Sequence, residues 1–525
     1  MFALLLLAAA LGACYLWGTR NFSYWRRRGV RHDRPLPFFG TNARNYLLRN
    51  SFTELATEAY RKYPRERVVG FYRANRPELV LRDPELARRV LVADFASFYP
   101  RGLTAQGRTP EPLLRNLFFA DGDLWRLLRQ RMTPTFTSGK LRAMFPLVVE
   151  RAERLQARAL HAAAAGRELD ARDLMARYTT DFIGACGFGL DSDSLGDDDS
   201  AFRRLGARIF RLGAKEMFAV MLRDMFPALF ADLRALGRVE ADFLRLVGEV
   251  LRRRGHEPSG RHDFVDSLLE CRARGTMEVE SLERRRADGT PERATLEMDD
   301  TIVAAQVFVF FAAGFETSSS ATSMTLHELA HHPRVQRRAQ AEVDAVLARH
   351  GGKLSYDAVK EMTYLEWTLK EGMRVFPSLG FLIRECARRY TFEGLGLTVD
   401  PGVRVVVPLQ ALHNDPQYFE RPDEFRPERH DPARADPRTK YVYMPFGDGP
   451  RACIGECVGP LGARLGLMQS LAGLAAVLAR FSVRPAPGAP RRPAVNPASG
   501  IVQSVAGGLP LLFELRDATP PPGAH

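Results

Sequence analysis

The residues best suited to chemistry lie in a glycine-rich stretch near the C-terminus, Phe446 to Gly455. Its three glycines and one proline favour a tight loop, because glycine adopts backbone conformations that other residues avoid. The loop carries one cysteine, Cys453, close to Arg451. Backbone N–H groups and positive charge stabilise a thiolate, the form of cysteine that binds metals. The stretch therefore predicts either a thiolate ligand or an inert buried cysteine, and the loop alone does not decide between them.

A second group of reactive side chains lies inside the longest apolar segment, which we expect to be helical to about Leu329. Gly314, Glu316 and Thr317 fall near its centre. A carboxylate beside a hydroxyl can relay protons, and a buried acid without a task would be costly. The simpler interpretation is a helix kink eased by glycine, with the Thr317 hydroxyl bonded to a main-chain carbonyl. The two interpretations are compatible.

This segment is apolar on nearly all faces, so a membrane span is an alternative to a core helix. Gln306 and Glu316 interrupt it, and its charge-free run is shorter than the roughly 20 residues that a bilayer requires. Asp299 or Asp300 is a suitable N-cap. We therefore expect a capped helix buried in a large core.

Two further pairs of polar residues have helical spacing. Trp125 and Arg129 lie four residues apart, so an indole N–H and a guanidinium would share one face, and both donate well to carboxylates. Glu371 and Arg374 lie three apart in a helix predicted over Tyr364–Phe376, which Pro377 would stop. Either spacing arises by chance in many helices.

Taken together, these motifs resemble the cytochrome P450 family. The loop matches the family pattern Phe-x-x-Gly-x-Arg-x-Cys-x-Gly at Phe446, Gly449, Arg451, Cys453 and Gly455. The resemblance implies that Cys453 is the axial thiolate ligand of the iron of haem b, with the rest of the loop forming part of the cofactor site.

The resemblance also gives roles to the other motifs. Gly314 would leave room above the iron, Thr317 would bond dioxygen or its water, and Glu316 would take part in proton delivery. Trp125 and Arg129 would hold a haem propionate.

Near the C-terminal third, the family pattern implies a buried ionic network of Glu371, Arg374 and Arg429, which we classify as structural. His430 stands where the family usually has an aromatic residue, which predicts a modest change in packing.

Arg384 resembles a propionate-binding arginine, and its neighbours Phe381 and Leu382 would face the substrate. Two departures follow the cysteine loop, Cys457 in place of a common arginine and Pro460 inside an expected helix. They predict a helix that begins late or kinks, with weakened haem affinity.

The composition suits one large enzyme domain. The chain has 525 residues, of which 46% are hydrophobic and 26% charged, and no long Gly/Ser linker divides it. We expect a mainly α protein with small β-sheets (α+β), the cytochrome P450 fold. Residues 67–81 predict two short strands, and residues 275–291 predict an exposed connection. The six cysteines show no paired framework, which suits a reducing compartment.

The N-terminus predicts a membrane anchor. Residues 1–17 are almost wholly apolar and arginines follow them, whereas a signal peptide carries its basic residues first. The positive-inside rule then places the catalytic domain in the cytosol. The resemblance to microsomal members implies that the membrane is that of the endoplasmic reticulum. We expect a signal anchor over 1–19, a basic, proline-containing hinge over 20–37 and a catalytic domain over 38–525. A lipoprotein signal and a mitochondrial location are the less favoured alternatives.

The net charge of +13 is compatible with an anionic membrane or an acidic partner protein, and no nucleic-acid-binding signature accompanies it. The resemblance implies NADPH-cytochrome P450 reductase as electron donor, cytochrome b5 as an additional donor, O2, membrane lipid and a lipophilic small-molecule substrate. The expected reaction inserts one oxygen atom from O2 into that substrate, as in arthropod members that oxidise xenobiotics. The alternatives are a haem-thiolate isomerase or dehydratase, which uses no O2, and a non-catalytic haem or lipophile binder.

Overall fold

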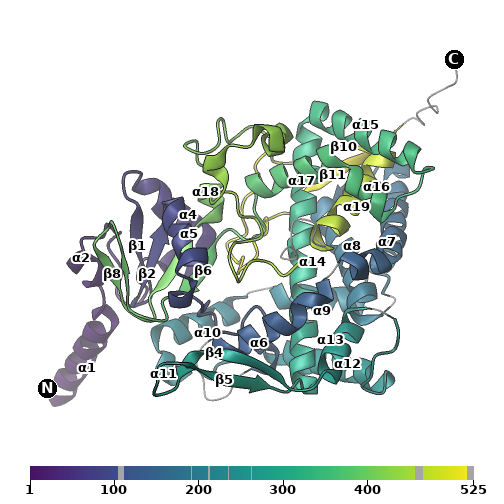
Figure 1. Cartoon of the computed structure of the whole chain (residues 1–525). Coiled ribbons are helices and arrows are strands. Elements are labelled where there is room, and N and C mark those ends of the chain that lie inside the picture. The colour runs from purple at the N-terminus through teal and green to yellow at the C-terminus, as the bar shows by residue number, and fades with distance from the viewer. Residues whose placement is uncertain are drawn as a thin grey trace.

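The computed structural model describes residues 1–104, 111–136, 138–190, 192–210, 213–234, 236–261, 263–455 and 465–516. The chain is mainly helical with small sheets, as expected. Figure 1 shows one helix, α14, running through the larger, helical part, while a sheet and the first helix lie at the opposite side. Cys457 and Pro460 fall outside the described residues.

The α-helices, in chain order, are α1 (Phe2–Thr19), α2 (Tyr24–Arg27), α3 (Ala43–Tyr46), α4 (Phe52–Lys62), α5 (Pro84–Arg88), α6 (Gly122–Met132), α7 (Ser138–Ala164), α8 (Ala171–Ile183), α9 (Ala201–Phe210), α10 (Ala214–Met225), α11 (Pro227–Phe230), α12 (Gly237–Arg253), α13 (Phe264–Ala273), α14 (Asp300–His331), α15 (Pro333–Arg349), α16 (Tyr356–Glu361), α17 (Thr363–Val375), α18 (Leu409–Leu412) and α19 (Leu465–Arg480).

The strands form small sheets. They are β1 (Val68–Arg73), β2 (Arg76–Leu81), β3 (Leu169–Asp170), β4 (Met277–Arg285), β5 (Pro291–Leu296), β6 (Leu382–Glu385), β7 (Tyr390–Phe392), β8 (Leu397–Val399), β9 (Arg404–Val407), β10 (Phe481–Pro485) and β11 (Pro510–Leu515). One sheet has the order β1-β2-β9-β6 and another β10-β11-β3, while β4 pairs with β5 and β7 with β8. The two strands expected over residues 67–81 are confirmed.

The central helix α14 is a core helix. The Asp299 side chain accepts a hydrogen bond from the backbone N–H of Ile302 at 2.6 Å, which gives the helix its predicted N-cap. Helices α8, α17 and α19 pack around it. Among the described residues, α1 and α14 are the helices long and apolar enough to cross a membrane, but 61% of the apolar window of α14 is buried, against 6% for α1. The core interpretation of α14 is therefore confirmed.

Helix α1 projects from the body of the molecule (Figure 1), and Gly18 is its one buried residue. The segment that follows differs from the hinge expected over residues 20–37. Trp25 is fully buried and its indole N–H donates to the Phe71 carbonyl at 3.1 Å, while the Gly70 N–H donates to the Arg31 carbonyl at 2.8 Å. The segment therefore packs against β1. Burial of the large Trp25 side chain stabilises this packing, which a free linker would not have.

Residues 275–291 were expected to be an exposed connection, and this is wrong in part. Strands β4 and β5 form a hairpin along α6, as Figure 1 shows. Buried Asp123 of α6 accepts bonds from the Ser281 hydroxyl at 2.7 Å and the Leu282 N–H at 2.6 Å. The side chains of Met277 and Val279 point to the core, and exposed charged side chains alternate with them along β4. These charges concealed the strand pattern in the sequence. The hairpin thus supports the helix that carries Trp125 and Arg129.

Candidate active site

A cavity of about 350 Å³ lies where α6, α14, β6 and the cysteine loop meet. Most of its wall is apolar. Most residues singled out from the sequence lie on it, namely Trp125, Arg129, Gly314, Thr317, Arg384, Phe446, Arg451, Cys453 and Gly455. The exceptions are Glu316, Gly449 and the three residues of the ionic network.

The cysteine loop is shaped by glycines in left-handed backbone conformations. Gly447 has a φ of +75° and Gly449 a φ of +73°. A Cβ atom on Gly449 would lie 2.0 Å from the Leu91 carbonyl oxygen, so only glycine fits there. The Cys453 N–H donates to the Phe446 carbonyl at 2.9 Å, which closes the loop.

Cys453 reaches the cavity wall with an exposed side chain. The neighbouring Gly455 is close to it, since a Cβ atom on Gly455 would lie 3.8 Å from the Cys453 sulfur. The sequence left open a buried cysteine at this position, and the structure shows that Cys453 is not buried. Cys186, Cys271 and Cys386, by contrast, are buried.

Four arginines line the same cavity, namely Arg101, Arg129, Arg384 and Arg451. Burial lowers the pKa of Arg384 to about 9 and that of Arg451 to about 10, and the charge of Arg451 adds to the shift at Arg384. Burial and the neighbouring arginines also lower the pKa of Arg101 well below its ordinary value. In each case the pKa is lowered because a positive charge is unfavourable when it is removed from water and close to other positive charges.

These guanidinium groups have few anionic partners. Arg451 donates to Asp121 at 2.9 Å and to the Ala120 carbonyl at 2.8 Å, but its Nε and Nη1 atoms are buried without a hydrogen-bond partner. Arg384 donates to the Ile383 carbonyl at 2.8 Å and leaves Nε unpartnered. The Asp121 carboxylate also accepts from the backbone N–H groups of Arg101 and Gly102. Among the residues that the structure describes, Arg384 and Arg451 therefore keep N–H groups that an anion could occupy.

Trp125 and Arg129 both face the cavity, as their spacing predicted. The Arg451 guanidinium lies 4.5 Å from the centre of the Trp125 ring, in a cation–π contact. Arg129 donates to the Ala452 carbonyl at 2.9 Å, so α6 is tied directly to the cysteine loop. Arg101 was missed by the sequence analysis because it lies in an irregular segment, where no periodicity distinguishes it from a surface arginine.

The wall formed by α14 carries Gly314 and Thr317, three residues apart on one face. The Thr317 hydroxyl donates to the Ala313 carbonyl at 2.6 Å, which is the back-bonded arrangement considered from the sequence. Its own carbonyl accepts a bond from the Ser378 hydroxyl at 2.9 Å.

Glu316 does not lie on the cavity wall. Its carboxylate accepts a hydrogen bond from Arg172 of α8 at 2.8 Å, and its side chain is 7% exposed. Consecutive helical residues point about 100° apart, and here Glu316 points toward α8 while Thr317 faces the cavity. The carboxylate instead joins α14 to α8.

Gly314 was expected to leave room in the cavity, and the space beside it is occupied in part. A Cβ atom there would lie 2.3 Å from the Ile183 side chain of α8, which also lines the cavity. The absent side chain therefore lets α8 pack closely against α14.

On β6, Leu382 and Arg384 face the cavity and Phe381 does not. The ring of Phe381 packs against Phe52 at 4.8 Å, on the other side. The expectation that both Phe381 and Leu382 line the cavity is wrong for Phe381, because adjacent residues of an extended chain point to opposite faces.

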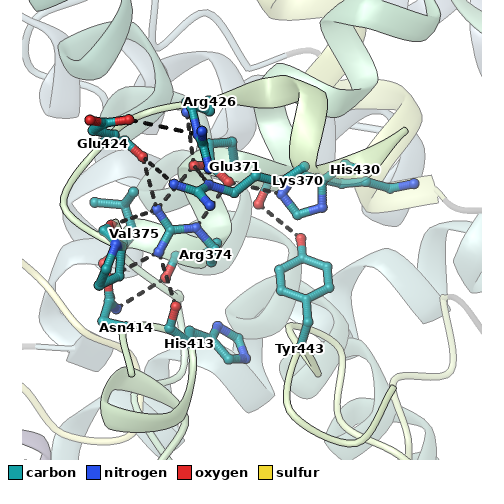
Figure 2. A network of polar contacts seen from close by, with 12 residues as sticks. Lys370, Glu371, Arg374, Val375, His413, Asn414, Glu424, Arg426, His430 and Tyr443 are labelled. Atoms are coloured by element: carbon teal, nitrogen blue, oxygen red, sulfur yellow. Dashed lines mark hydrogen bonds and ion pairs between the residues drawn. The ribbon is translucent and has the colours of Figure 1, made fainter. Parts of the chain in front are cut away.

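The predicted ionic network is present away from the cavity (Figure 2). Glu371 and Arg374 are fully buried, and the guanidinium donates to both carboxylate oxygens at 2.9 and 3.0 Å. Arg429 donates to Glu371 at 3.3 Å. His430 also contacts this carboxylate, at 3.0 Å, which the expectation of a packing change alone did not anticipate. The hydrogen bonds from Arg374 and His430 hold the pKa of Glu371 down, at about 2, against the opposing effect of burial.

An exposed thiol and several buried guanidinium groups around an apolar cavity, in a helical fold, are suited to an anionic metal cofactor with a thiolate ligand. The family model for Cytochrome P450 matches residues 31–508. The relatives include Cytochrome P450 6a2 of Drosophila melanogaster, 37% identical over 92% of this chain and 94% of that protein. Cytochrome P450 6B6 of Helicoverpa armigera is 34% identical over 93% of each chain. The chain belongs to the cytochrome P450 family, is a haem-dependent monooxygenase, and is similar to insect members of the family.

The residues around the cavity fit haem, whose propionates are anions. The unpartnered N–H groups of Arg384 and Arg451 are the donors that carboxylates need, and Cys453 offers a thiol at the same wall. The cavity thus presents both kinds of contact that a haem with a thiolate ligand requires.

The two left-handed glycines of the loop give a matched test. Gly449→Ala should destabilise the protein by about 3 kcal/mol or more, because a left-handed alanine would also meet the Leu91 carbonyl. Gly447→Ala should cost about 1 kcal/mol, since no atom lies closer than 3.7 Å to its Cβ position. Urea unfolding of both variants measures the difference, and equal costs would contradict the assigned contact.

The buried histidines predict how stability depends on pH. Burial lowers the pKa of His413 to about 3, with the Arg374 charge adding to the shift, and burial also lowers the pKa of His430. An unfolded histidine binds a proton near pH 6.5, so acid favours the unfolded state. Stability is full above about pH 6.5 and falls below it, by roughly 1 kcal/mol for His413 between about pH 7 and 5.5.

Urea unfolding at these two pH values measures this loss. His413→Gln should reduce the slope of stability against pH, and an unchanged slope would show that other groups carry the acid sensitivity.

Proposed function

We propose that this protein is a membrane-anchored, microsomal enzyme that inserts one oxygen atom from O2 into lipophilic foreign compounds. The electrons would come from NADPH through a flavoprotein reductase, with cytochrome b5 as an additional donor. The observation that carries the proposal is the exposed Cys453 thiol on a cavity otherwise lined by arginines and apolar side chains.

Haem b would be held by the side chains already on the wall. Cys453 would provide the sulfur ligand, and the unpartnered N–H groups of Arg384 and Arg451 would bind the propionates together with Arg101 and Arg129. When bound, the haem supplies the redox chemistry that activates O2, and a thiolate ligand favours cleavage of the O–O bond. Trp125 packs beneath Arg451 and keeps its guanidinium in place.

Thr317 supplies the hydroxyl on the opposite wall. Because the hydroxyl donates its own proton to the Ala313 carbonyl, its lone pairs remain free to accept a hydrogen bond from water in the cavity. We assign it the task of holding that water in place, so that the water can pass protons to the reacting oxygen.

We assign Glu316 to the outer part of the same proton path. It lies next to Thr317 in sequence, and its partner Arg172 is 33% exposed, so the ion pair connects α14 with solvent. A carboxylate that leaves such a pair can take up a proton and carry it inward.

The substrate is expected to be lipophilic because apolar side chains form most of the remaining wall. They include Phe118, Phe119, Ile183, Phe310, Leu382 and Val502. Such a lining binds by removing apolar surface from water and sets few polar requirements.

Attachment to the endoplasmic reticulum rests on α1 and its surroundings. Its apolar side chains are exposed, and Trp17 near its end stacks on Phe226 at 4.8 Å. Phe218 and Leu229, on α10 and α11, are exposed as well. Apolar groups on these elements can share the membrane with α1.

The first test is the spectrum of the reduced, CO-bound protein. The wild type should show the red-shifted Soret band of a thiolate-ligated haem, and Cys453→Ala should abolish it because no other exposed thiol lines the described part of the cavity. Cys14→Ala, in α1, is the control and should keep the band. A wild-type protein without this band would refute the proposal, and product formation without O2 uptake would favour an isomerase or dehydratase.

The second test concerns the hydroxyl on α14. Thr317→Ala should keep the CO spectrum but lower the product formed per NADPH consumed several-fold, while Thr317→Ser restores it. Thr322→Ala is the matched control, since Thr322 also donates to the carbonyl four residues earlier, at 2.7 Å, but is buried away from the cavity. Equal coupling in Thr317→Ala and wild type would remove the assigned role.

A further inference from the structure

His430 completes the set of donors around the buried Glu371 carboxylate (Figure 2). One carboxylate oxygen accepts from Arg374 Nη2, the Arg426 backbone N–H and Arg429. The other oxygen accepts from Arg374 Nε at 2.9 Å and from His430 Nε2 at 3.0 Å. Glu371 is ionised and cannot donate, so His430 Nε2 carries the hydrogen of this bond.

The imidazole of His430 also contacts Tyr443. Their ring centres lie 4.9 Å apart, and on another side Tyr443 contacts the His413 ring at 5.2 Å. The Tyr443 hydroxyl donates to the Lys370 carbonyl at 2.9 Å, in α17 directly before Glu371. Tyr443 is therefore held by two imidazoles and by the helix that carries the carboxylate.

Tyr443 begins the stretch that enters the cysteine loop. The next residue, Met444, donates its backbone N–H to His413 Nε2 at 3.1 Å. The Gly447 N–H then donates to the Met444 carbonyl at 3.0 Å, and the Cys453 N–H to the Phe446 carbonyl at 2.9 Å. Bonds and ring contacts thus run without interruption from Glu371 through His430 and Tyr443 to the main chain of Cys453.

We propose that His430 is a positioning residue for the haem ligand, which couples the Glu371 carboxylate to Tyr443 and so fixes the main chain that presents Cys453. An aromatic hydrocarbon at this position could contact Tyr443 but could not donate to Glu371. In this chain, His430 makes both the contact with Tyr443 and the hydrogen bond to Glu371. The inference rests on the proposed function of Cys453 as haem ligand.

The groups that face His430 explain why its neutral form is suited to this place. Its 8% exposed side chain lies among the charges of Lys370, Arg374, Arg429 and Glu371, beside the ring of Tyr443. The guanidinium groups of Arg374 and Arg429 already contact this carboxylate. A neutral N–H donor from His430 adds a hydrogen bond without adding a third buried positive charge.

Two substitutions separate the bond from the ring. His430→Phe keeps an aromatic ring beside Tyr443 and removes the donor, whereas His430→Gln keeps an N–H donor and removes the ring. His350→Phe is the matched control, because His350 contacts Glu361 at 2.9 Å in a similar His–Glu pair at the surface.

The measurement is the rate at which the reduced, CO-bound protein loses its thiolate-type Soret band on mild warming, followed beside far-ultraviolet circular dichroism. His430→Phe should lose the band about tenfold faster than wild type while the helical signal persists. His430→Gln and His350→Phe should stay close to wild type.

A second measurement does not require haem. In the haem-free protein, hydrogen exchange of the peptide that covers residues 443–453 should be faster in His430→Phe than in wild type or His430→Gln, because the positioned main chain is released.

The outcomes separate this inference from the proposed function. A wild-type protein without the thiolate-type band refutes the proposed function and the inference with it. A normal wild-type band with equal rates in His430→Phe and His350→Phe refutes the inference alone. Loss of the band only in step with the helical signal would also refute it, since His430 would then support the whole fold rather than the loop.

Discussion

The structure depends on how its buried positive charge is balanced. Guanidinium groups are costly to bury unless carboxylates and carbonyls surround them, and two clusters of this chain meet that condition to different degrees. Around Glu371, every carboxylate oxygen has at least two N–H donors, and Arg374 spreads its remaining N–H groups over the carbonyls of His413 and Pro422. Around the cavity, Arg384 and Arg451 keep unpartnered donors. The Glu371 carboxylate thus finds all its donors within the protein, whereas the described residues leave guanidinium N–H groups at the cavity without an acceptor.

This difference assigns the two clusters to different tasks. The network around Glu371 fixes geometry, and it borders the main chain that leads into the cysteine loop. At the cavity, the unpartnered guanidinium N–H groups raise the free energy of the protein. A bound anion would lower it, so binding of the cofactor should also stabilise the fold. The pKa values of Arg384 and Arg451, lowered mainly by burial, mark the site where this relief is needed. The hydrogen bond from Arg129 to the Ala452 carbonyl ties α6 to the cysteine loop at this site.

Features that are local in sequence could be predicted, and those set by tertiary packing could not. Helical spacing correctly placed Trp125 and Arg129 on one face, and capping chemistry located the start of α14 at Asp299 or Asp300, of which Asp299 is the N-cap. The motif likeness brought Glu371, Arg374 and Arg429 together, although nearly sixty residues separate the first from the last. Arg101 was missed because its position depends on Asp121 and Phe118 in a later part of the chain. The β4–β5 hairpin was missed because charges on its exposed face hid the alternation of its buried one.

The same distinction explains the two cases in which adjacent residues were expected to act together. Glu316 and Thr317 are neighbours in a helix, and Phe381 and Leu382 are neighbours in an extended segment, so each pair divides between two faces. In both pairs, residues adjacent in a sequence motif therefore belong to different contact surfaces of the same element. For α14 this has a consequence for chemistry, since the acid lies toward α8 and solvent while the hydroxyl lies toward the cavity. A helix that separates an acid from a hydroxyl by about 100° keeps the ionised carboxylate out of an apolar cavity and still leaves both within one turn of each other.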